Sequence, residues 1–146
     1  MRVHPRVAID GGAGVGKSTI GERLARLLGN PYVDTGAFYR TLTAVALEAG
    51  VSPEDAEALR RLAEQMPIII VPPAGSETDG RQYTVLVGER DFTPLLRTPA
   101  VEAAVSRVAI YPAVRTTLIR RMRELAEQHG VVMVGRDIGT VVLPDA

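Results

Sequence analysis

The stretch IDGGAGVGKST, residues 9–19, decides how this chain can fold. It begins at the end of a short apolar run, residues 6–10, which is typical of a buried parallel strand. It leads into residues 18–28, whose apolar side chains recur at helical spacing. A strand, a loop of the form Gly-x-x-x-x-Gly-Lys-Ser and a helix in this order predict a P-loop. In such a loop, backbone N–H groups and the helix N-terminus point at phosphate oxygens.

One residue of this motif stands out in the composition. Lys17 is the only lysine of the chain. The other sixteen of the seventeen lysine and arginine residues are arginine. The compact cation of Lys17 can follow the β- and γ-phosphate oxygens of a nucleotide, and the hydroxyl of Ser18 can bind Mg²⁺. We therefore expect a catalytic cation at Lys17 and a metal ligand at Ser18. The residues expected to bind nucleotide phosphates are Gly11, Gly12, Ala13, Gly14, Val15, Gly16, Lys17, Ser18 and Thr19.

The rest of the chain alternates between strand and helix signals. The expected strands after the first are 31–34, 68–71, 83–87 and 131–134, and the expected helices are 18–28, 37–49, 52–65, 98–110 and 112–129. This alternation predicts an α/β fold with a parallel sheet and with ligands at the carboxyl ends of the strands. The strands at 68–71 and 83–87 enclose a polar loop and predict a hairpin inside an insertion of about residues 66–92. Residues 135–140 are expected to form a loop.

Some local details are predicted as well. The start of the helix at 52–65 is predicted by an N-cap residue, a proline of the first turn and capping acids, which are Ser52, Pro53, and Glu54 with Asp55. Thr98 is the expected cap of the next helix. In the helix after the P-loop, one apolar face is formed by residues at helical spacing. These are Ile20, Leu24, Leu27 and Leu28.

Composition excludes several classes of protein. The 146 residues suffice for one cored domain, the formal net charge is zero, and the pI is about 6.7. A neutral chain without Trp is not typical of a protein that binds nucleic-acid polymers or anionic membranes. There is no cysteine, and no apolar stretch approaches the roughly 20 residues that span a bilayer. We expect a cytoplasmic protein without a leader peptide that acts as a monomer.

A P-loop alone does not define what accepts the phosphoryl group, so the other charged residues matter. Arg40 lies near the start of an expected helix, Arg115 opens another, and Arg136 and Asp137 follow the strand 131–134. These positions could bring the arginines together on a second anion. Taken alone, Arg40 and Arg115 are as readily explained as solvated helix residues without a ligand as they are by a role in binding an anion. Arg136, between a glycine and an aspartate beyond a core strand, is the stronger candidate.

At this point the sequence resembles a known family. The segments IDGGAGVGKST, VDTGAFYR, GERDFTPLLRTPAV, SRVAIYPAVR and GRDIGTVVLPDA occur in the order and spacing of bacterial cytidylate kinases. The resemblance runs from about residue 6 to residue 146. It implies a three-layer P-loop nucleoside-monophosphate-kinase fold with a parallel sheet. It also implies a core of residues 1–34, a nucleoside-monophosphate-binding insertion of residues 35–98 with a small β-hairpin, and a continued core of residues 99–146.

The resemblance also implies an activity, the transfer of the γ-phosphoryl group of ATP to CMP or dCMP with Mg²⁺. It assigns residues 11–19 to the phosphates of ATP. The residues it assigns to CMP are Thr35, Arg40, Ser106, Arg115, Arg136 and Asp137. Arg40 and Arg136 would hold the phosphate, and Arg136 would also be catalytic. An aspartate can accept from the N4 amino group of cytosine, and an arginine can donate to its O2 and N3 atoms. Without the resemblance, Ser106 would count as an ordinary polar helix residue.

Two departures from the family leave alternatives open. Val134 stands where an acid usually precedes the Gly-Arg-Asp triplet, and the sequence ends at Ala146, before the family's further strand, arginine-bearing lid and final helices. We therefore expect a truncated cytidylate kinase. The alternatives are another P-loop small-molecule kinase, of the UMP, AMP or shikimate type, and a nucleotide-binding module without catalysis.

Overall fold

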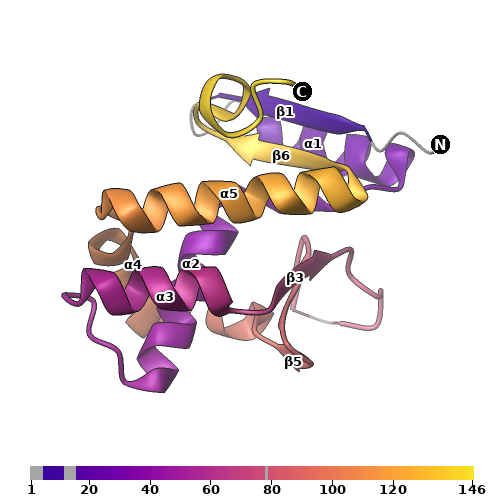
Figure 1. Ribbon diagram of the computed structural model, residues 1–146. Coiled ribbons are helices and arrows are strands. Elements are labelled where there is room, and N and C mark those ends of the chain that lie inside the picture. Colours follow the sequence, from indigo (N-terminus) through magenta and orange to yellow (C-terminus); the bar gives the residue numbers. More distant parts are fainter. Residues whose placement is uncertain (1–4, 12–15, 78) are drawn as a thin grey trace. The chain divides into compact units, whose positions relative to one another are not determined.

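The computed structural model describes residues 5–11, 16–77 and 79–146 (Figure 1). In chain order its elements are β1 (Arg6–Asp10), α1 (Lys17–Leu28), β2 (Tyr32–Asp34), α2 (Thr35–Ala49), α3 (Ala56–Gln65), β3 (Ile68–Val71), β4 (Thr84–Val87), β5 (Arg90–Asp91), η1 (Thr93–Leu95), α4 (Pro99–Ala109), α5 (Pro112–His129), β6 (Val131–Gly135) and η2 (Ile138–Val142). This mixed α/β content confirms the predicted fold class. Within the described ranges, no helix is both long and apolar enough to cross a membrane.

The chain divides into two compact units. The first comprises Met1–Thr35, Ile70–Thr84 and Met122–Ala146, and the second comprises Gly36–Ile69 and Val85–Arg121. The division expected from the sequence, with boundaries after residues 34 and 98, stays a prediction.

A parallel three-stranded sheet forms the centre of the first unit, as predicted. Its strand order is β1-β6-β2, and β6 pairs in parallel with both neighbours. Four successive valine and methionine side chains of β6, residues 131–134, are buried, as expected of a central parallel strand with both faces covered. Figure 1 shows β1 and β6 side by side, with η2 following at the end of the chain.

The buried face of α1 differs from the apolar face expected from its sequence. The side chains of Ile20 and Leu27 are 60% and 84% exposed, whereas Gly21 and Ala25 are buried. A Cβ atom built on Gly21 would lie 2.8 Å from the side chains of both Tyr32 and Val134. The helix therefore approaches β2 and β6 through its small residues, because the distance to the sheet leaves no room for a branched side chain.

The second unit is mostly helical, with its own core. One cluster of buried side chains joins α2, α4 and the segment after β5 through Ala44, Val101 and Phe92. The predicted strands β3 and β4 are neighbours in a second sheet. A third strand, β5, was not predicted: it pairs antiparallel with β4 across a tight turn at Gly88, whose φ is +63°. Of the residues in this turn, glycine is the one that adopts such a φ without strain.

Three local predictions are corrected. The helix expected from Ser52 begins at Ala56, because Asp55 accepts the capping hydrogen bond from the backbone N–H of Ala58. The helix α4 begins where expected, but the hydroxyl of Thr98 donates to a carbonyl of the preceding turn instead of capping α4. The segment after β6, expected as a loop, contains the π-helical turn η2.

Candidate functional site

Three strands of the first unit end at the same edge of the parallel sheet. In the register, Asp10 of β1 lies opposite Gly135 of β6, and Asp34 of β2 lies opposite Val134. The residues that follow these strands are the first of the P-loop after β1, Arg136 and Asp137 after β6, and the first of α2 after β2. The backbone N–H of Gly11 donates to the carbonyl of Gly135 over 3.3 Å, which ties the first two of these segments together. This is the edge at which open parallel sheets bind ligands.

The start of α1 is arranged as the P-loop motif predicts. Gly16 precedes the helix with a φ of +82°, a conformation that favours glycine. Lys17 is the first helical residue, and its Nζ donates to the carbonyl oxygen of Gly11 over 2.6 Å. The lysine side chain thus reaches the residue that follows β1. The expected ATP ligands Gly12, Ala13, Gly14 and Val15 lie outside the described residues.

The expected metal ligand Ser18 lies beside a buried tyrosine. Burial raises the pKa of the Tyr32 phenol, and a hydrogen bond with the Ser18 side chain partly opposes this rise. Ser18 and Thr19 are both exposed in the first turn of α1. Among the residues that the structure describes, no group of three or more His, Cys, Asp or Glu side chains is arranged around a metal position. A single hydroxyl nevertheless fits Mg²⁺, which takes few protein ligands when nucleotide phosphates and water supply the others.

The segment after β6 carries Arg136 and Asp137, both exposed. Asp137 has a φ of +57° and is the one non-glycine residue with positive φ among those described. Its carbonyl accepts the N–H of Val141 over 2.9 Å at the start of η2. An unusual backbone conformation next to a predicted ligand is common at functional sites.

Asp10 was missed by the sequence analysis. Its carboxylate accepts the backbone N–H groups of Ile138 and Gly139, the second over 3.0 Å. The strand β1 is thereby joined to the segment that carries Arg136 and Asp137. An acid at the last position of a strand, directly before a glycine-rich loop, was the available signal.

Thr35 is placed next to the same segment. A Cβ atom built on Gly135 would lie 2.9 Å from Thr35 Oγ1 and 3.0 Å from Ile138 Cδ1. The absence of a side chain at Gly135 therefore lets the start of α2 approach the end of β6. The structure thus places Thr35 beside Gly135, the first residue of the Gly-Arg-Asp triplet, and the assignment of Thr35, Arg136 and Asp137 to one ligand stays a prediction.

Arg40 lies in the second turn of α2, near its start as expected, although the helix begins at Thr35 and not at residue 37. Its Nε donates to Glu102 Oε1 of α4 over 3.0 Å, and the arginine side chain is only 21% exposed. A second arginine, Arg97, lies 3.8 Å from the same carboxylate oxygen. Ser106 follows Glu102 by four residues on α4, so both lie on the same face of this helix.

Arg115 lies at the start of α5 and contacts the residue before Arg40. Burial raises the pKa of the Tyr39 phenol, while the charge of Arg115 and a hydrogen bond with it act in the opposite direction. Tyr39 and Arg40 are adjacent on α2, and they contact α5 and α4 respectively. Within the second unit, the expected CMP residues Arg40, Ser106 and Arg115 thus belong to helices that meet at one turn of α2. The convergence of Arg40, Arg115 and Arg136 on one anion stays a prediction.

Val134, the first departure from the family pattern, lies in the core. It is 1% exposed, and its Cγ2 is one of the two atoms that limit the space at Gly21. A side chain at this position points between β6 and α1. An acid there would have to be buried beside the P-loop helix or turn toward the end of the strand.

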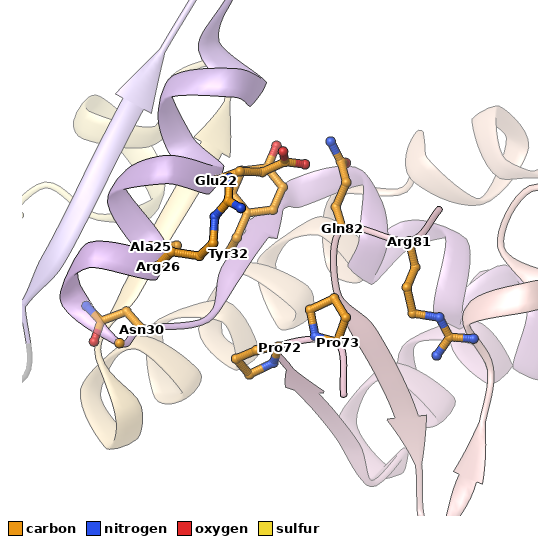
Figure 2. Close-up of a pocket in the computed structure, with 10 residues that line it drawn as sticks. Glu22, Ala25, Arg26, Asn30, Tyr32, Pro72, Pro73, Arg81 and Gln82 are labelled. Atoms are coloured by element: carbon orange, nitrogen blue, oxygen red, sulfur yellow. The ribbon is translucent and has the colours of Figure 1, made fainter. Parts of the chain in front are cut away.

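A separate cavity of about 410 Å³ lies in the first unit, between α1, β2 and the segment before β4 (Figure 2). Figure 2 shows Pro72 and Pro73 on one side and Glu22 and Tyr32 on the other. Close by, Tyr83 donates its hydroxyl hydrogen to Asp34 Oδ2 over 2.9 Å, and its ring lies 6.3 Å from that of Tyr32. The residues expected to bind ATP or CMP do not line this cavity.

Comparison with known proteins identifies the family. The family model described as cytidylate kinase matches residues 7–146. The chain belongs to the cytidylate kinase family. Among curated relatives, cytidylate kinase of Chloroflexus aggregans is 50% identical over 146 residues, all of this chain and 63% of the relative. Cytidylate kinase of Roseiflexus castenholzii is 51% identical over 140 residues, 96% of this chain and 60% of the relative. That of Herpetosiphon aurantiacus is 50% identical over the whole chain and 63% of the relative.

The match confirms the family that the sequence motifs indicated. It includes both compact units, and it runs from β1 through the P-loop and the Gly-Arg-Asp triplet to the last residue. The chain spans about three fifths of the length of these curated cytidylate kinases.

Proposed function

We propose that this chain binds ATP and CMP or dCMP and serves transfer of the γ-phosphoryl group from the first to the second, giving ADP and CDP or dCDP. The observation that carries the proposal is the family match over residues 7–146, which includes a P-loop and a Gly-Arg-Asp triplet at one edge of the same sheet. The reaction belongs to pyrimidine nucleotide metabolism.

On the donor side, residues 11–19 would hold the phosphates of ATP. Lys17 is supported in this role because its Nζ donates to the carbonyl of Gly11, the first residue of the motif, so its ammonium lies close to the backbone at the start of the P-loop. Ser18 would be the protein ligand of Mg²⁺, which when bound offsets the charge of the β- and γ-phosphates. These residues bind and orient the donor.

On the acceptor side, Arg40 and Arg136 would bind the phosphate of CMP. Arg40 is supported because it and Arg97 lie 3.0 Å and 3.8 Å from one oxygen of Glu102, so two guanidinium groups face an anion that a phosphate could replace. Ser106, Arg115 and Asp137 would bind cytosine, with Thr35 close to the monophosphate. Uracil would place a carbonyl against the Asp137 carboxylate and an N–H against Arg115.

The chemistry needs positioning more than proton transfer. The phosphate of a nucleoside monophosphate has a second pKa near 6, so at neutral pH it is largely a dianion and attacks without a general base. One of its oxygens forms a bond to the γ-phosphorus while the bond between that phosphorus and the β,γ-bridging oxygen breaks, and ADP keeps the electron pair. The residues assigned to catalysis, Lys17 and Arg136, would offset the charge of the two anions as they approach.

Ligand-induced thermal stabilisation tests this proposal against other P-loop kinases. We expect CMP and dCMP to raise the melting temperature in the presence of an ATP analogue, and UMP, AMP and shikimate to have little effect at the same concentration. Arg115→Ala should remove the difference between CMP and UMP. Equal stabilisation by all the nucleoside monophosphates would contradict the assignment of a cytosine site.

Nucleotide binding without transfer is a second candidate, favoured by the buried valine at position 134. The two candidates differ in CMP-dependent release of ADP from ATP. Turnover that is abolished by Lys17→Ala supports the kinase, whereas tight binding of both nucleotides with no turnover supports the second candidate. We further propose that the protein acts in the cytoplasm as a monomer, on free nucleotides and without nucleic-acid or membrane partners.

A further inference from the structure

The segment that follows β6 is fixed at both of its ends by side chains from other elements of the first unit. At its start, the carboxylate of Asp10 accepts the N–H groups of Ile138 and Gly139. At its end, Arg123 of α5 donates from Nε to the carbonyl of Val142 over 2.8 Å, and also from Nη2 to the carbonyl of Val141. Together these bonds give partners to N–H groups at the start of η2 and to carbonyl groups at its end. Such groups at the ends of a helix have no partner within the helix itself.

The contact at Asp10 is the closer one to the predicted ligands. Arg136 and Asp137 lie between the last pair of the sheet, at Gly135, and the two N–H groups that Asp10 accepts. Two residues are thus held between one anchor on β6 and another on β1. Gly139 fits the second anchor closely, because a Cβ there would lie 3.1 Å from Asp10 Oδ2.

The backbone conformation of Asp137 is a second observation in favour of an ordering effect of the Asp10 hydrogen bonds on this segment. Its φ of +57° is unfavourable for a residue with a side chain. Such a conformation persists only where the surrounding bonds determine it. The bonds from Ile138 and Gly139 to Asp10 begin at the next residue, and the carbonyl of Asp137 itself accepts from Val141, so the backbone is bonded directly after the unusual φ.

We propose that Asp10 is a positioning residue, whose carboxylate holds Arg136 and Asp137 in the conformation that binds the monophosphate nucleotide. It acts through the backbone of η2 and contacts neither nucleotide itself. This inference rests on the proposed function for its ligand, but its structural half concerns the ligand-free chain and is tested separately.

The first experiment is amide hydrogen exchange on the ligand-free protein, with Asp10→Asn and Asp10→Ala. Asn keeps one oxygen acceptor and Ala keeps none, so exchange of the Ile138 and Gly139 amides should accelerate in the order wild type, Asn, Ala. We expect an increase of about tenfold or more for Ala, because a charge-assisted bond to each amide is lost. Amides of β6, residues 131–134, should keep their protection. Unchanged exchange at Ile138 and Gly139 would overturn the inference whatever the ligand proves to be.

The second experiment measures the affinities for CMP and for a non-hydrolysable ATP analogue by calorimetry. Asp10→Ala should weaken CMP binding by about tenfold or more and change ATP-analogue binding by less than about threefold. Because Asp10 also precedes the P-loop, the opposite pattern, with the larger loss for the ATP analogue, would overturn the inference. Asp10→Asn, which keeps one acceptor, should lie between wild type and Ala and serves if the Ala variant does not fold.

A matched control and a combined variant separate positioning from general stability. Asp55→Ala removes another capping carboxylate, the one that accepts from Ala58 in the second unit, and should leave CMP affinity unchanged. In a background that already carries Arg136→Ala and Asp137→Ala, the further change Asp10→Ala should cost little CMP affinity, because residues that act through one another are not additive. Full additivity would overturn the inference. Failure of the wild-type chain to bind CMP would refute the proposed function while the exchange result still decides the role of Asp10.

Discussion

Replacing Gly21 with alanine sets two effects of opposite sign against each other. In the interior of a helix alanine is more favourable than glycine by about 1 kcal/mol, so helix propensity alone predicts stabilisation. In this structure, however, the new Cβ would lie 2.8 Å from Tyr32 Cε2 and 2.8 Å from Val134 Cγ2. Both are side chains of a buried sheet face, and inserting a methyl group into a packed core costs about 1–3 kcal/mol.

The packing cost should therefore win. We expect Gly21→Ala to lower the free energy of unfolding by up to about 2 kcal/mol after the gain in propensity is subtracted. For a chain of this size each kcal/mol shifts the melting temperature by about 2–4 °C, so a fall of about 4–8 °C corresponds to the upper value. Thermal and urea unfolding followed by circular dichroism measure both quantities.

Two further variants make the result interpretable. Ile20→Ala changes a neighbouring residue of α1 that is 60% exposed, and it should alter stability by no more than about 0.5 kcal/mol. Val134→Ala removes one of the two atoms that oppose the new methyl group, so Gly21→Ala should cost less in that background. An increase in melting temperature for Gly21→Ala alone would refute the packing of α1 on β6 described above.

Three other predictions concern the site. Arg40→Ala should weaken CMP binding by about tenfold or more but leave binding of cytidine, which lacks the phosphate, unchanged in calorimetry; equal losses for both ligands would contradict a phosphate contact. Asp137→Ala should be less stable than Asp137→Gly by about 1 kcal/mol in urea unfolding, because only glycine adopts positive φ without cost; both should lose the preference for CMP over UMP, and equal stability would argue against the positive φ. The pKa values of Tyr32 and Tyr39 are raised above 10.0 by burial, so their contribution to stability is present below pH 10 and is lost as the pH rises through the raised values. Unfolding measured between pH 8 and 11 should show this fall, and Tyr39→Phe should reduce it.

The sequence predicted the elements whose determinants are local. The strand at 6–10, the P-loop helix and the parallel strand after His129 follow from apolar runs bounded by glycine. The strand β5 was also accessible, since the Gly88–Glu89 pair is a two-residue hairpin turn between apolar and polar residues. It was missed because a two-residue strand gives no periodicity.

Other features depend on contacts that are distant in the sequence. The turn at residues 52–55, which delays the start of α3 to Ala56, is closed locally by the bond from the N–H of Asp55 to the carbonyl of Ser52. It also has distant partners, because Tyr111 donates to the carbonyl of Pro53 and Arg107 pairs with Glu54. The sequence around Ser52 does not indicate that Tyr111 and Arg107 contact this turn. The sequence predicted a capped helix here correctly, but it placed the N-cap at Ser52, about one turn before the observed N-cap at Asp55.

The same distinction applies to the candidate site. Lys17 and Arg136 were identified by motif, and Thr35 by resemblance alone. The partners of Asp10 and Glu102 could not be predicted, because they are Ile138, Gly139 and Arg40, which are distant in the sequence; only the position of Asp10 before the glycine-rich loop was a local signal. The buried face of α1 was mistaken for a similar reason: only the short distance to the sheet at Gly21 favours the small side chains over the leucines.

The central claim, a cytosine-specific acceptor site, is tested most directly by calorimetric titration of the chain with CMP and with UMP in the presence of a non-hydrolysable ATP analogue. The account predicts that CMP binds at least about tenfold more tightly than UMP, because uracil would place a carbonyl against the Asp137 carboxylate and an N–H against the Arg115 guanidinium, so that neither side chain finds its hydrogen-bond partner. It also predicts that Asp137→Ala brings the two affinities together. Equal affinities for CMP and UMP in the unmodified chain, with the ATP analogue bound normally, would contradict it.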